Sequence, residues 1–142
     1  EAYYGKKVED TPTKRFDLMN AINARGPYIA TYKVLPHMLK QKYGRILLVS
    51  PPIYSRFFNG KTPYAMTKIA ASVLTMGLAN ELQNTGVSIN SLWPATAIKS
   101  QVIINKTTAQ NSILREPSIF ADACIEIIQD NNLNGQLLLD ED

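Results

Sequence analysis

The sequence predicts an α/β fold in which helices alternate with the strands of a parallel sheet. Segments with strand character lie at 45–50, 87–93 and 136–139. The first of them is a continuous apolar run, as in parallel strands that helices cover on both faces. Segments with helical character precede the strands, at 13–42, 62–85 and 117–130. The order helix, strand, helix, strand, helix, strand favours right-handed crossovers within one sheet.

The first helical segment, 13–42, carries an apolar stripe that runs from Phe16 to Leu39. Two sites along it disturb a regular helix, Gly26-Pro27 and Pro36. Proline removes a helical hydrogen bond, and its ring clashes with the carbonyl one turn earlier. We therefore expect a kink or a break at these sites.

The second helical segment, 62–85, has recognisable signals at both ends. Thr62 is a suitable N-cap, Pro63 suits the first turn, and Gly86 can end the helix. Its interior is rich in small residues, which allow a neighbouring backbone to approach closely.

The third helical segment, 117–130, follows a polar segment at 95–116. Its apolar residues recur at helical spacing, and we expect them to face the sheet. These residues are Ile119, Phe120, Ala123, Cys124, Ile127 and Ile128.

The composition is that of an ordinary globular domain and argues against several classes of protein. Of the 142 residues, 45% are hydrophobic and 19% are charged, which fits one domain. The apolar runs are far shorter than the ~20 residues of a membrane span. One cysteine, Cys124, and one histidine, His37, argue against a disulfide, a histidine-based triad and a metal cluster. The net charge is +3 and the basic residues of 14–45 are spread out, so we expect no nucleic-acid-binding patch.

The spacing of Tyr64 and Lys68 points to acid–base chemistry. Residues four apart lie on the same face of a helix. A free tyrosine, with a pKa of about 10, is a poor acid–base catalyst at neutral pH. A lysine cation one turn away favours the phenolate, as does the positive end of the helix, so the pair can pass a proton to or from a substrate oxygen. The spacing alone does not separate such a pair from an exposed helix pair, since Tyr3 and Lys7 share it.

The surroundings of Tyr64 and Lys68 add to this pattern. The pair follows an apolar strand that ends in Ser50 and precedes a helix rich in small residues, and Asn23 lies in the helix upstream. In this succession the chain resembles the short-chain dehydrogenase/reductase family over 9–140, and within it a hydroxysteroid dehydrogenase-like group. The resemblance implies an α/β fold that is the C-terminal half of a Rossmann-like doubly wound parallel sheet. Further matching segments are 10–18, Ser50-Pro51-Pro52, Leu92-Trp93-Pro94, Thr96-Ala97-Ile98 and the closing Asp140-Glu141.

The resemblance implies a role for each matching residue. Tyr64 would be the proton donor or acceptor, and Lys68 would hold the ribose hydroxyls of the nicotinamide nucleotide and lower the tyrosine pKa. Asn23 would hold a water in a proton relay from that lysine; alternatively, it kinks or caps its helix. The segment 95–115 would be a variable lid over the substrate, or else a plain surface loop. The cofactor site would also include Pro94, Thr96, Ala97 and Ile98.

The chain departs from the family pattern at the catalytic serine. Pro51 occupies the position thirteen residues before the tyrosine, and proline has no hydroxyl. Ser50 is one residue earlier and is one candidate replacement, and Ser55 in the following loop is another. The third possibility is that the substrate oxygen lacks its second donor, and such a loss typically costs about 3 kcal/mol of transition-state stabilisation.

A second departure concerns the glycine-rich turn that brings a dinucleotide to a helix N-terminus in this family. None of the seven glycines belongs to a Gly-x-Gly sequence. We therefore expect 1–142 to be a single partial domain that lacks the N-terminal glycine-rich cofactor-binding strands.

Two functions from different classes follow. The first is an NAD(P)-dependent oxidoreductase acting on a carbonyl or alcohol, with NADP slightly favoured over NAD by the resemblance. The second is a catalytically weak or inactive dehydrogenase-like subunit of a larger complex. The resemblance also implies a small lipid-like substrate, a homo-oligomer formed through helices 13–42 and 62–85, and an intracellular location that is mitochondrial or peroxisomal.

Overall fold

The computed structural model describes residues 5–99 and 114–140. Within them lies a parallel sheet in the order β1-β2-β3, formed by Gly44–Val49, Val87–Pro94 and Leu137–Asp140. The central strand β2 pairs with β1 from Gly44 opposite Val87 onward, and with β3 from Ser91 opposite Leu137 onward. The predicted parallel α/β arrangement is confirmed.

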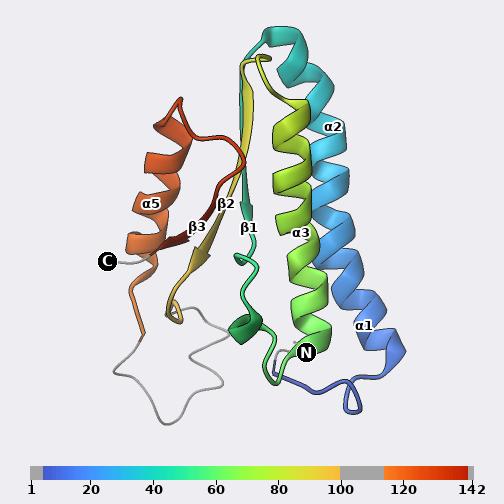
Figure 1. Cartoon of the computed structure of the whole chain (residues 1–142). Coiled ribbons are helices and arrows are strands. Elements are labelled where there is room, and N and C mark those ends of the chain that lie inside the picture. Colours follow the sequence, from blue (N-terminus) through green and yellow to red (C-terminus); the bar gives the residue numbers. More distant parts are fainter. Residues whose placement is uncertain (1–4, 100–113, 141–142) are drawn as a thin grey trace.

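Helices cover both faces of this sheet (Figure 1). On one face, a long helical rod packs beside α3, which spans Thr62–Glu81. On the other face lies α5, Pro117–Gln129. This is the doubly wound arrangement that the sequence predicts. The rod consists of α1 (Thr13–Asn20), the π-helical turn η1 (Ala21–Arg25) and α2 (Gly26–Gln41).

The rod passes through both proline sites without a break. At the first site, the N–H of Gly26 donates to the carbonyl of Ala21, five residues earlier, which is the π-helical pattern. Pro27 has no N–H and cannot bond the carbonyl of Asn23 as an α-helix would require, so the wider turn accommodates its ring. Pro36 lies inside α2. The sequence correctly predicted that the helix is irregular near Gly26-Pro27. The irregularity is a π-helical turn within a continuous helix, not a break.

The ends of α3 differ from the prediction by a few residues. Lys61, not Thr62, is the N-cap, and no side chain caps the helix. The helix ends at Glu81, and a turn leads to Gly86, whose φ is +82°. A Cβ atom at Gly86 would collide with the carbonyl oxygen of Lys42, so glycine is required where β1 and β2 begin side by side.

The core lies between β2 and α3. The side chains of Ile89 and Leu92 are almost completely buried in the central strand. On α5 only Ile127 is buried, while Ile119 and Ile128, which we expected to face the sheet, are 38% and 43% exposed. Each helical residue turns by about 100°, so Ile128 points about 100° away from Ile127. Ile119 remains on the sheet side, where it lines a pocket together with Leu92 and Leu138.

Two chemical features are absent from the described residues. No helix there is long and apolar enough to cross a membrane. No three His, Cys, Asp or Glu side chains there group so as to hold a metal ion.

Of the predicted polar segment 95–116, residues 100–113 lie outside the described residues, so the lid prediction concerns a part that the structure does not describe. Its two flanks meet. Ile98 and Arg115 form a parallel bridge, and Lys99 and Glu116 form an exposed ion pair at 3.1 Å.

Candidate active site

The first two turns of α3 bring Tyr64 and Lys68 to the carboxyl ends of the strands. Both side chains are half-buried, and Ala65 and Thr67, which lie between them in the sequence, are buried. The ammonium of Lys68 donates a 3.3 Å hydrogen bond to the carbonyl of Val49, the last residue of β1. Lys68 therefore points toward the strand ends, where ligands bind in open α/β sheets.

Trp93 provides the second contact of Lys68. The ammonium lies 5.6 Å from the centre of the Trp93 ring, within the range of a cation–π interaction. Burial lowers the pKa of Lys68 below its usual value of 10.5, because desolvation disfavours the charged amine.

Asn23 is linked to α3 through Thr67. The Asn23 side-chain amide donates to Thr67 Oγ1 at 3.1 Å, and Thr67 Oγ1 donates to the backbone carbonyl of Tyr64 at 2.8 Å. Asn23 lies within the π-turn, so it caps neither end of the rod. The turn is thereby held against the start of α3.

The candidate serines have very different surroundings. Ser50 follows β1 directly and is completely buried, and no hydrogen-bond partner of its hydroxyl is found among the described residues. Pro51 is also buried, and its carbonyl accepts a hydrogen bond from the hydroxyl of Ser72 on α3. Ser55 is exposed at the start of a short 3₁₀ helix, Ser55–Phe57. Within the described part of the chain, no hydrogen bond therefore joins the Ser50 hydroxyl to Tyr64 or Lys68.

The residues after β2 are fixed mainly through their backbone. The N–H of Ala95 donates to Asp140 O at 3.4 Å, and the carbonyl of Ala97 accepts from the N–H of Arg115 at 3.1 Å. The hydroxyl of Thr96 is buried, and the part of the chain that the structure describes offers it no hydrogen-bond partner.

Arg115 and Asp140 form a buried ion pair that the sequence interpretation missed. Arg115 Nη2 lies 3.3 Å from Asp140 Oδ1, and Arg115 Nη1 donates to the Asp140 carbonyl at 2.6 Å. The pair joins the segment before α5 to the end of β3. Asp140, a charged residue at the end of an apolar strand, could have been recognised in the sequence as needing a partner. Nothing in the sequence indicated that Arg115, 25 residues earlier, is that partner.

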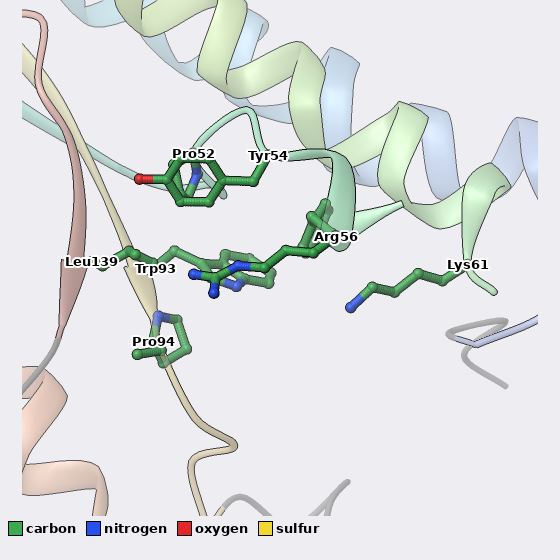
Figure 2. A pocket seen from close by; sticks show the side chains of 9 residues that line it. Pro52, Tyr54, Arg56, Lys61, Trp93, Pro94 and Leu139 are labelled. Carbon is green, nitrogen blue, oxygen red and sulfur yellow. The ribbon is translucent and has the colours of Figure 1, made fainter. Parts of the chain in front are cut away.

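A pocket of about 330 Å³ lies at the ends of β2 and β3, beside the loop that leads to α3 (Figure 2). Trp93 forms one of its walls, and Lys68 contacts that tryptophan. Tyr64 and Lys68 themselves do not line it. The sequence interpretation missed this pocket as well. Its side chains are supplied mainly by Tyr54, Arg56, Phe57, Lys61, Trp93 and Leu139.

Comparisons with known proteins match the chain to one family. The family model described as short chain dehydrogenase matches residues 3–111. Hydroxysteroid dehydrogenase-like protein 2 from Danio rerio and from Homo sapiens are each 35% identical to the chain over 136 residues. The aligned part covers 93% of this chain and 32% of each relative, so the chain spans about a third of their length.

Solved structures show the same fold. A short chain dehydrogenase from Mycobacterium thermoresistibile superposes with a TM-score of 0.86 at 32% identity, covering 99% of this chain and 52% of that one. A Beutenbergia cavernae protein solved with bound NADP at low occupancy has a TM-score of 0.82 at 18% identity, covering 94% and 59% of the two chains. The chain therefore spans about half of the solved folds that it resembles.

Proposed function

Because the chain belongs to the short-chain dehydrogenase family, we propose that it carries the proton-transfer residues of an NAD(P)-dependent oxidoreductase acting on a carbonyl or alcohol. The single observation behind this proposal is the position of Lys68. Its half-buried ammonium is held at the strand ends by the Val49 carbonyl and the Trp93 ring, one helical turn from Tyr64. Since the chain spans a third of its curated relatives, it would supply the catalytic part of a longer domain.

Tyr64 would transfer the proton. In the reducing direction its hydroxyl gives a proton to the oxygen of the substrate carbonyl as negative charge develops there. The Lys68 ammonium would stabilise the phenolate that remains, because an adjacent positive charge favours the ionised form. Oxidation of an alcohol would use the same residues in the opposite order.

The residues around Lys68 suit a nicotinamide nucleotide. Lys68 would bond the ribose hydroxyls, with Pro94, Ala97 and Ile98 beside the nicotinamide. The Thr96 hydroxyl, which has no hydrogen-bond partner among the described residues, would bond the carboxamide. When bound, this cofactor supplies or accepts the hydride. We favour NADP slightly over NAD, in line with the NADP in the Beutenbergia cavernae protein.

Asn23 would take part in supplying protons to this pair. Pro27 cannot donate to the Asn23 carbonyl, so this oxygen does not receive its usual α-helical hydrogen bond. A carbonyl in this situation can accept a hydrogen bond from water, and a water held there would connect Lys68 to solvent. The hydrogen bond to Thr67 fixes the position of Asn23 relative to α3.

The second donor to the substrate oxygen is the weakest part of the site. Ser50 is buried and Ser55 is exposed on a loop, so either would have to move to reach a substrate. This observation favours the alternative that we carry forward: a catalytically weak or inactive dehydrogenase-like subunit of a larger complex.

In either case a homo-oligomer would form through the rod and α3, where Met66 and Val73, seven residues apart on α3, are 59% and 55% exposed.

The test uses the full-length protein, assayed for NADPH and NADH binding and for reduction of small lipid-like ketones. Lys68→Met should weaken nucleotide binding and remove turnover, whereas Lys40→Met, at an exposed lysine on α2, should behave as wild type. A wild-type protein that neither binds nucleotide nor reduces any ketone would support the assembly role instead.

A further inference from the structure

The described residues that line the pocket beside Trp93 include two cations and no carboxylate. Arg56 and Lys61 line it together with aromatic and aliphatic side chains, and its described lining includes neither aspartate nor glutamate. Figure 2 shows the Lys61 amine and the Arg56 guanidinium directed into the same space. Two like charges in one pocket repel each other, so an anion bound between them is favoured.

Arg56 is held in a way that leaves it available to a ligand. Its guanidinium carbon lies 5.2 Å from the centre of the Tyr54 ring, so the ring supports the planar group. Among residues 5–99 and 114–140, no acidic side chain forms an ion pair with Arg56. A stacked guanidinium keeps its N–H edge for bidentate binding of a carboxylate or phosphate.

Lys61 is connected to the catalytic lysine by two aromatic rings. Its ammonium lies 4.5 Å from the centre of the Phe57 ring. Phe57 is buried and meets Trp93 edge to face, with 5.3 Å between ring centres and 88° between planes. Trp93 in turn contacts Lys68. These rings form a continuous apolar surface that leads from the cationic pocket toward the proton-transfer residues.

We propose that this pocket binds an anionic group of the substrate, so that the substrate is an oxo or hydroxy compound with an aromatic or apolar body and a carboxylate or phosphate. Arg56 and Lys61 hold the anion, while Phe57 and Trp93 pack against the body. The carbonyl end then lies toward the Lys68 side of Trp93. This inference deepens the proposed function and rests on it for the location of the reacting carbonyl.

The experiment compares three probes with the full-length protein: 4-acetylbenzoate, 4-acetylphenyl phosphate and the neutral 4-acetylbenzamide. Binding is measured by calorimetry and turnover by NADPH consumption. An anionic probe should bind at least about tenfold more tightly than the amide, because charge-assisted hydrogen bonds are stronger than neutral ones. The tighter of the two anionic probes shows whether the substrate's anionic group is a carboxylate or a phosphate.

Arg56→Gln and Lys61→Gln should each remove about tenfold of the preference for the anion and leave amide binding unchanged. Arg56→Glu should reverse the preference. Lys40→Gln, at an exposed lysine away from the pocket, is the matched control and should change nothing.

The outcomes separate this inference from the proposed function. Preferential anion binding that depends on Arg56 and Lys61 supports the pocket assignment even if no probe is reduced, in which case only the oxidoreductase proposal fails. Equal binding of all three probes, or a preference that survives both glutamine variants, overturns the pocket assignment even if the protein reduces the ketones.

Discussion

The side-chain amide of Asn23 donates a 3.1 Å hydrogen bond to the hydroxyl of Thr67, across 44 residues of sequence. Thr67 lies between Tyr64 and Lys68 on α3, and its hydroxyl donates a hydrogen bond to the Tyr64 carbonyl at 2.8 Å. One threonine therefore links the π-turn of the rod to the backbone that carries the proposed catalytic tyrosine.

Thr67→Val removes this link while preserving the shape of the side chain. We expect a loss of about 1–2 kcal/mol of stability, since Asn23 loses its partner in a partly buried position. We also expect turnover to fall about tenfold as Tyr64 loses its fixed position. Thr75→Val is the matched control, because Thr75 is equally buried on α3 and donates only within the helix, to Ala71. Equal turnover in the two variants would show that the link has no catalytic importance.

Pro27→Ala restores the backbone N–H of residue 27, which can then donate the α-helical hydrogen bond to the Asn23 carbonyl. The π-turn should then relax, and stability should rise by about 1–3 kcal/mol as the helical hydrogen bond forms. Turnover should nevertheless fall, because the Asn23 carbonyl becomes occupied. Pro36→Ala, inside α2, should raise stability without affecting turnover. Urea unfolding and steady-state kinetics on both variants give the comparison, and unchanged turnover in Pro27→Ala would argue against a water held by Asn23.

Lys68→Met tests the burial of the proposed catalytic lysine through the pH dependence of stability. Burial lowers the pKa of Lys68, so the folded state bears a desolvation cost whenever the amine is charged. Below the folded pKa the variant should be more stable than wild type. As pH rises from the folded pKa to the usual value of 10.5, the unfolded chain binds more protons, wild type gains stability, and the difference shrinks. Urea unfolding over this range should show this convergence, and a difference that does not depend on pH would contradict it.

Much of the fold could be predicted from local signals. The apolar run at 45–50 and the proline and small residues after Thr62 are properties of neighbouring residues, and they located β1 and α3 to within a few positions. The π-turn could not be predicted in form. Gly26-Pro27 shows where a hydrogen bond is lost, but whether the helix breaks or widens depends on its packing against α3.

The site could be predicted only where its residues are close in sequence or match a family. The spacing of Tyr64 and Lys68 is of this kind. The contact of Lys68 with Trp93 depends on the crossover that brings β2 beside β1, and so does the pocket that Arg56 lines together with Trp93. The burial of Ser50 likewise depends on tertiary packing, so it could not be predicted from the local sequence around Pro51.

The central claim is that the Tyr64 hydroxyl carries the proton, and Tyr64→Phe in the full-length protein tests it most directly. This change removes one oxygen and keeps the ring, while Tyr43→Phe, at an exposed tyrosine beyond α2, removes the same atom away from the site. We predict that Tyr64→Phe lowers kcat by about 100-fold or more while the Kd for NADPH stays near the wild-type value, and that Tyr43→Phe changes neither. Wild-type kcat in Tyr64→Phe would contradict the account.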